Sequence, residues 1–124
     1  FSVAEIVISP EPVLYSGIIK PDVAVLIATE GKAKIARLTK AMEASDTIYF
    51  ADGLGDVDSP ANQLPLEFPE SAKKDVRKNI SALTAGFLTK ELKLFPFEAL
   101  KDAVRQIQKP KITEINLGVL AHFE

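Results

Sequence analysis

The chain has 124 residues, of which 47% are hydrophobic, so it can form a domain with a buried core. It has no cysteine and one histidine, which excludes a disulfide framework, a thiolate zinc site and a thiolate-held iron–sulfur cluster. The net charge of −2 and the short apolar runs argue against nucleic acid and membrane as partners, and we expect a cytoplasmic protein.

The N-terminal half has the pattern of a β–α–β unit. Residues 4–9 are short and β-branched, which indicates a strand, and residues 22–29 form a continuous apolar run typical of a strand buried on both faces. Residues 30–45 change to a helical period, and residues 46–52 indicate a third strand. The first residue is Phe1 and the chain opens directly into a strand-like run, so we expect an N-terminal portion to be missing, with a processed mature protein as the alternative.

The C-terminal half is helical after a loop at residues 53–69. The pattern predicts a helix over 70–92 that breaks near Asn79, then helices over 96–108 and 111–124. A short strand is possible near Leu64–Phe68. The residues expected to face inward on the last two helices are Leu100, Val104, Ile107, Ile112, Ile115, Val119 and Phe123. Together the patterns predict a single domain over residues 1–124, an α/β fold with three layers (α/β/α) and a mostly parallel sheet.

The loop that begins at Asp52 resembles a phosphate loop, because Gly53 and Gly55 follow a predicted strand. Acidic residues surround the glycines, and no basic residue occurs between Lys40 and Lys73, so an anion would be repelled. The spacing does not match a calcium loop either. We therefore interpret this loop as a solvated acidic turn, with phosphate and metal binding as alternatives.

A basic segment follows it, with Lys73, Lys74, Arg77 and Lys78 within six residues. On a helix the last three would share a face, which could meet an acidic protein or a phosphorylated cofactor. An ordinary solvated helix face is the favoured alternative.

A few polar residues stand at positions where binding sites occur. Glu30 and Asp52 follow predicted strands, and ligands of open α/β sheets gather at the carboxyl ends of strands. Asn79 and Asn116 interrupt apolar helical runs, where asparagine is more often a local hydrogen bonder or a cap than a ligand. His122 lies near the C-terminus, and a surface or interface role is favoured for it over catalysis.

Several segments, taken in order, resemble the γ subunit of the 2-oxoacid:ferredoxin oxidoreductases, the family that includes the pyruvate enzyme. The segments are SVAEIVIS (2–9), KPDVAVLIATEGKAKI (20–35), TIYFAD (47–52), KNISALTAGFLTKEL (78–92), FEALKDAVRQ (97–106) and EINLGVLAHFE (114–124). The resemblance departs from the family in three places. The family's Gly-x-Gly-Gly-Gln-Gly segment has no counterpart here, the small residues at 82–86 are shifted, and loop 53–69 does not align. The chain would correspond to the C-terminal two thirds of that domain.

The resemblance implies a subunit of a complex that decarboxylates a 2-oxoacid on thiamine diphosphate, sends electrons through iron–sulfur clusters to ferredoxin and transfers the acyl group to coenzyme A. This chain would contribute subunit packing and coenzyme A access within an oligomer, and would be inert alone. The candidate cofactor-binding residues are Glu30, Asp52 and Asn79, and we expect no catalytic or metal-binding residue. The alternatives are a free-standing α/β module that binds a nucleotide or metabolite and a domain that supplies only an interface.

Overall fold

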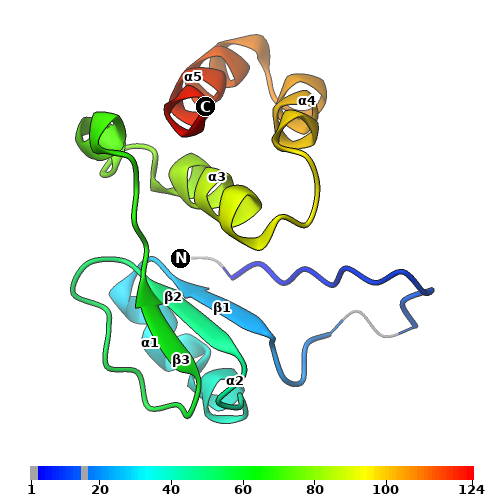
Figure 1. Ribbon diagram of the computed structural model, residues 1–124, viewed down its shortest axis with the longest axis vertical. Helices are drawn as coiled ribbons and strands as arrows, with labels where there is room; N and C mark the ends of the chain where they lie inside the picture. The colour runs from blue at the N-terminus through cyan, green and yellow to red at the C-terminus, as the bar shows by residue number, and fades with distance from the viewer. Residues whose placement is uncertain (1–2, 15–16) are drawn as a thin grey trace. The chain divides into compact units, whose positions relative to one another are not determined.

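The computed structural model describes residues 3–14 and 17–124 (Figure 1). The chain divides into two compact units, residues 1–66 and residues 67–124. The first unit holds the sheet and two short helices, and the second unit is helical. Each unit has its own buried cluster of apolar side chains.

A small parallel sheet forms the first unit. Its strands are β1 (Val23–Leu26), β2 (Thr47–Phe50) and β3 (Asn62–Pro65), in the order β1-β2-β3. Both pairings are parallel, with Leu26 opposite Phe50 and Phe50 opposite Pro65. The predicted α/β class and the parallel pairing are confirmed. Strand β3 begins two residues before the segment near Leu64–Phe68 in which the sequence indicates a possible strand.

Two short helices connect β1 to β2, where the sequence predicts one helix over 30–45. These are α1 (Thr29–Lys34) and α2 (Ala36–Lys40), with Ile35 between them outside the helical region at φ −108° and ψ 18°. Ile35 packs against the core of this unit. The hydroxyl of Ser59 donates a hydrogen bond to the carbonyl of Thr39 where α2 ends, and this carbonyl also accepts the backbone N–H of Met42 at 3.3 Å.

The core of the first unit combines sheet, helix and loop residues. Its buried members are Ala24, Leu26, Met42, Ile48, Leu54, Val57 and Ala61. Three of these, Leu54, Val57 and Ala61, belong to the segment predicted as a solvated turn. The loop is therefore a packed part of the unit, while the side chains of Asp52, Asp56 and Asp58 are exposed.

The predicted strand at residues 4–9 is wrong in this structure. Residues 3–14 contain no helix or strand, and Figure 1 shows them as an extended trace. Ile6 and Ile8 are 75% and 62% exposed. A strand requires a neighbour that accepts its ladder of hydrogen bonds, and among the described residues β1 pairs only with β2.

The second unit consists of three helices in mutual contact, with a turn of 3-10 helix at each end. They are η1 (Glu70–Asp75), α3 (Ile80–Leu92), α4 (Phe97–Ile107), α5 (Pro110–Leu120) and η2 (Ala121–Phe123). The predicted break near Asn79 is confirmed, since this residue precedes α3 with non-helical angles.

The buried cluster of this unit is Ala72, Leu83 and Val119, with Phe68, Val76, Ala82 and Phe123 packed against it. Val119 and Phe123 face inward as predicted. Ile107, Ile112 and Ile115 are wrong predictions, because they are 82%, 48% and 50% exposed. On α4, Leu100 and Val104 are half-buried, and of the three predicted residues only Ile107 at the end of the helix is exposed. On α5 the buried residues are Val119 and Leu120.

Candidate functional site

Glu30 and Asp52 lie at the carboxyl edge of the sheet, as the sequence predicts. Glu30 is in the first turn of α1, just after β1, and Asp52 follows β2 by two residues. Because Leu26 and Phe50 are directly opposite in a parallel pair, both side chains follow neighbouring strands at the same edge. Both are exposed. Their position is confirmed, and their role in binding stays a prediction.

The loop after β2 is held by bonds that use its own backbone groups. The amide N–H of Val57 donates to Oε1 of Gln63 at 2.8 Å, and Nε2 of Gln63 donates to the carbonyl of Val57 at 2.7 Å. Nζ of Lys32 donates to the carbonyl of Gly55 at 3.0 Å. A phosphate loop needs free N–H groups that converge on the anion. Here one amide is already bonded, and the nearby Asp56 carboxylate is exposed.

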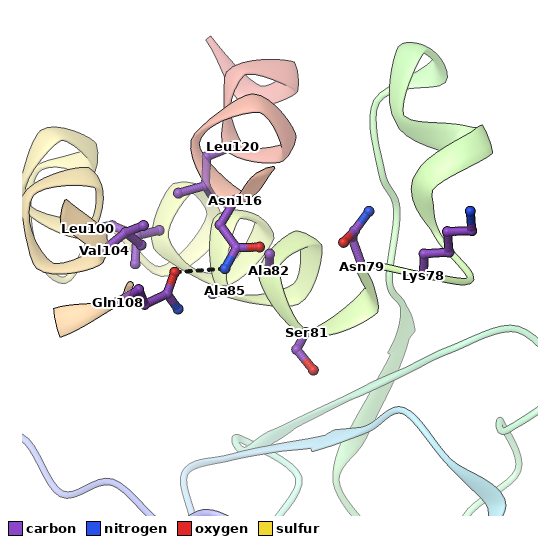
Figure 2. Close-up of a pocket in the computed structure, with 10 residues that line it drawn as sticks. All are labelled: Lys78, Asn79, Ser81, Ala82, Ala85, Leu100, Val104, Gln108, Asn116 and Leu120. Atoms are coloured by element: carbon purple, nitrogen blue, oxygen red, sulfur yellow. Dashed lines mark hydrogen bonds between the residues drawn. The ribbon is translucent and has the colours of Figure 1, made fainter. Parts of the chain in front are cut away.

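Asn79 belongs to the second unit and lines a cavity there. The cavity has a volume of about 330 Å³ and lies among α3, α4 and α5 (Figure 2). Its lining residues are Lys78, Asn79, Ser81, Ala82, Ala85, Leu100, Val104, Gln108, Asn116 and Leu120. The three predicted cofactor-binding residues therefore divide into one pair in the first unit and one residue in the second.

Polar side chains occupy two parts of the cavity wall. Nδ2 of Asn116 donates a hydrogen bond to Oε1 of Gln108 at 2.8 Å, which fixes the two amides against each other (Figure 2). Lys78, Asn79 and Ser81 surround the start of α3. Asn79 precedes the helix but makes no side-chain capping bond there, so its amide remains available to a ligand.

The remaining wall is apolar and consists of Ala82, Ala85, Leu100, Val104 and Leu120. The two alanines on α3 have small side chains, and this leaves part of the space between the helices open. An apolar wall with a few convergent polar groups is the general make-up of a small-molecule site. The arrangement suits a ligand with an apolar body and polar ends.

The basic segment found in the sequence adjoins this cavity through Lys78. Lys73, Lys74, Arg77 and Lys78 are all exposed, and Lys73 lies 4.0 Å from the carboxylate of Glu70. Within the residues that the structure describes, the other three form no ion pair. The second unit has ten basic and eight acidic residues, whereas the first has five and nine. The surface beside the cavity is therefore suited to an anion.

The sequence predicts only part of this cavity. Its pattern indicates Asn79 and Asn116 as local hydrogen bonders, which holds for Asn116, but it does not mark Ser81 or Gln108. These residues come together only because three helices pack, so no local pattern could have joined them. In the described parts of the chain no three histidine, cysteine, aspartate or glutamate side chains gather closely enough to hold a metal ion. None of the helices described is both long and apolar enough to cross a membrane.

Comparison with known proteins gives no assignment. No protein-family model matches the chain, and neither the curated proteins nor the solved structures contain a significant match.

Proposed function

We propose that this chain is a subunit of a 2-oxoacid:ferredoxin oxidoreductase complex that carries no iron–sulfur cluster, and that it contributes subunit packing and coenzyme A access. The support from the sequence is the ordered set of segments that resemble the γ subunit, together with the lack of cysteine. On this proposal the chain corresponds to the C-terminal two thirds of a γ-type domain. On this proposal helices of the assembled complex would cover both faces of its sheet, and the complex would operate in the cytoplasm.

The observation that carries the proposal is the cavity beside the basic segment. Coenzyme A has several phosphate groups and an apolar pantetheine arm. Lys74, Arg77 and Lys78 provide cations for phosphates, since charge-assisted hydrogen bonds to phosphate are strong. The apolar wall of the cavity provides a surface for part of the arm. A cavity of about 330 Å³ is at the lower end of the range for ligand sites, so only one portion of coenzyme A would enter it.

The chemistry of the complex would belong to its other subunits. The iron–sulfur clusters that pass electrons to ferredoxin require cysteine ligands, which this chain lacks. On this proposal thiamine diphosphate is also bound by another subunit. We expect the purified chain to oxidise no 2-oxoacid by itself. Co-purification from the native cell with cysteine-rich partners and thiamine diphosphate is the direct test. Recovery of the chain without such partners would contradict the proposal.

Coenzyme A binding can be measured separately by titration calorimetry on the full chain. Lys78→Ala and Asn79→Ala are expected to weaken binding, whereas Lys111→Ala, an exposed lysine on α5 outside the cavity lining, should leave it unchanged. Equal affinities in all four proteins would remove the cavity from the proposal.

A second candidate function is a free-standing module that binds a small anionic metabolite, and the same cavity favours it. It differs from the first in one measurable respect. A free-standing module binds its ligand tightly as an isolated chain and has no stable partner. Tight binding of a different anionic metabolite by the isolated chain, with no co-purifying subunit, would favour this second function.

A further inference from the structure

A second polar cluster in the helical unit joins Ser71, Asp75 and His122. Ser71 and Asp75 lie four residues apart on η1, and His122 lies on η2. Oγ of Ser71 is 2.9 Å from Nδ1 of His122, and Nε2 of His122 is 2.8 Å from Oδ2 of Asp75. The imidazole is largely buried, with 19% of its side chain exposed, whereas Ser71 is exposed.

The chemistry of the three groups sets the direction of both hydrogen bonds. The carboxylate of Asp75 can only accept, so Nε2 of a neutral His122 must carry the proton. Nδ1 is then the unprotonated nitrogen, with a lone pair directed at Ser71. The hydroxyl of Ser71 therefore donates its proton to Nδ1.

The backbone on both sides of the cluster is anchored. Ala72, next to Ser71, is fully buried in the core of this unit, and Phe123, next to His122, packs against the same core. Glu124 forms an ion pair with Lys101 at 2.6 Å. A nucleophile and its base keep a productive geometry when packed neighbours fix both of them.

We propose that Ser71 is a nucleophile activated by His122 as general base, with Asp75 as the positioning residue that fixes the imidazole. A nucleophile hydrogen-bonded to a base, which a third group orients, is the general arrangement of acyl-transfer sites. The substrate class is small activated acyl esters or thioesters, which can reach Ser71 because its side chain is exposed. This inference is independent of the proposed function.

The reaction balances with these groups and water alone. Oγ of Ser71 bonds to the acyl carbon, its proton passes to Nδ1 of His122, and the bond to the leaving alcohol or thiol breaks as that group takes the proton. Water then attacks the acyl-serine while Nδ1 of His122 removes a proton from it. The bond between the acyl carbon and Oγ breaks, Oγ takes the proton back from Nδ1, and the carboxylic acid leaves. No oxidant, reductant or metal enters.

A variant with a single thiol tests the activation at position 71 without reaction at any other thiol. The chain has no cysteine, so Ser71→Cys introduces the only thiol. Ser45→Cys is the matched control, because Ser45 is an exposed turn residue for which no hydrogen bond occurs in the described structure. Iodoacetamide should alkylate Ser71→Cys at neutral pH roughly 10-fold faster than Ser45→Cys, because a neighbouring imidazole promotes thiolate formation.

The dependence on His122 completes that test. Adding His122→Gln to Ser71→Cys should reduce its alkylation rate to that of Ser45→Cys and remove the low-pH part of the rate profile. Equal rates for Ser71→Cys and Ser45→Cys would overturn the proposal, and this comparison needs no substitution at His122.

The native serine is tested with a fluorophosphonate probe and mass spectrometry. We expect the label on Ser71, with loss of labelling in Ser71→Ala and unchanged labelling in Ser45→Ala. Asp75→Asn should slow labelling and shift its pH profile, since the amide does not require the proton on Nε2. Labelling that survives in Ser71→Ala, or that occurs at no serine, would contradict the assignment.

Discussion

At the scale of single residues, the best-defined charge contact of the first unit joins Lys20 and Asp46. Nζ of Lys20 lies 2.8 Å from Oδ2 of Asp46, whose side chain is 6% exposed. The same carboxylate accepts the backbone N–H of Glu43 at 2.7 Å. The hydrogen bond from Lys20, followed by that of the Glu43 amide, lowers the pKa of Asp46. The hydrogen bond to Asp46 raises the pKa of Lys20. The turn before β2 is thus fastened by a buried carboxylate.

The lowered pKa of Asp46 makes the stability of the first unit depend on pH. The unfolded aspartate has a pKa of about 3.9, so the stabilisation is present above this value and is lost as the pH falls through the lower folded pKa. The raised pKa of Lys20 affects stability at high pH, where the stabilisation from Lys20 is lost as the pH rises through its folded pKa. Asp46→Asn should lower the urea midpoint of unfolding at neutral pH. The difference in this midpoint between Asp46→Asn and wild type should become smaller in acid.

Tyrosine fluorescence can follow the urea unfolding of the first unit, because both tyrosines lie in residues 1–66 and the chain has no tryptophan. Asp58→Asn is the control, since its 3.7 Å pair with Lys40 is exposed and surface pairs contribute little. A difference between Asp46→Asn and wild type that stays constant down to the lowest pH would contradict the role of the carboxylate.

Gly86 permits a close approach that a larger residue would prevent. A Cβ added at Gly86 would lie 2.5 Å from the ring of Phe123, which packs against the core. Gly86→Ala should destabilise the second unit by about 1–3 kcal/mol through overpacking, more than the roughly 1 kcal/mol that alanine gains as a helix former. Gly118→Ala on α5 has open space around its Cβ and should be neutral or stabilising. Helical circular dichroism during urea unfolding compares the two.

At the scale of elements, α3 ends in a strained residue. Lys93 follows α3 with φ 51° and ψ 37°, in the left-handed region that glycine tolerates best. We expect Lys93→Gly to be more stable than Lys93→Ala by about 1 kcal/mol, the cost of a left-handed L-residue. Both variants lose the same charge, so their difference isolates the backbone effect. Equal unfolding midpoints of the two would show that this helix end carries no such strain.

The sequence predicts an element well where the apolar residues of that element are the ones that become buried. β1 comes from a run rich in valine, isoleucine and leucine, and β2 has the β-branched and aromatic sequence TIYF; half of the residues in each strand are buried. β3 has the sequence NQLP, and the sequence indicates a possible strand only two residues later, near Leu64–Phe68. It exists because the amides of Asn62 and Leu66 donate to the carbonyls of Asp46 and Phe50. Such an edge strand is set by its neighbour and not by its own residues.

Contacts distant in sequence explain the other differences. The helix expected over 30–45 ends early where Ser59, 20 residues away, bonds to its last turn. The apolar spacing of α5 marked Ile112 and Ile115 as inward, but α3 and α4 pack against a different face. For the candidate sites, the positions of Glu30 and Asp52 are predictable, because residues that follow parallel strands lie at the carboxyl edge of the sheet. The Ser71–His122–Asp75 cluster spans 51 residues, so a single histidine gave no local signal of it.

At the scale of the whole molecule, the first unit has an unsatisfied strand edge and an exposed apolar segment. In the described residues β1 has a strand on one side only. The segment 3–14 exposes several large apolar side chains, namely Val3, Ile6, Val7, Ile8, Val13 and Leu14. Unpaired edges and β-branched, extended segments are the features through which chains associate. The purified chain should therefore self-associate as its concentration rises.

Sedimentation velocity over a concentration series measures this association. Ile6→Asp together with Ile8→Asp should shift the chain toward the monomer, because charges in an extended segment oppose strand pairing. Ile107→Asp is the control for general stickiness, since Ile107 is 82% exposed but lies on a helix in the second unit. If the wild type remains a monomer throughout, the exposed segment does not drive association. If Ile107→Asp abolishes it instead, the contact belongs to the helical unit.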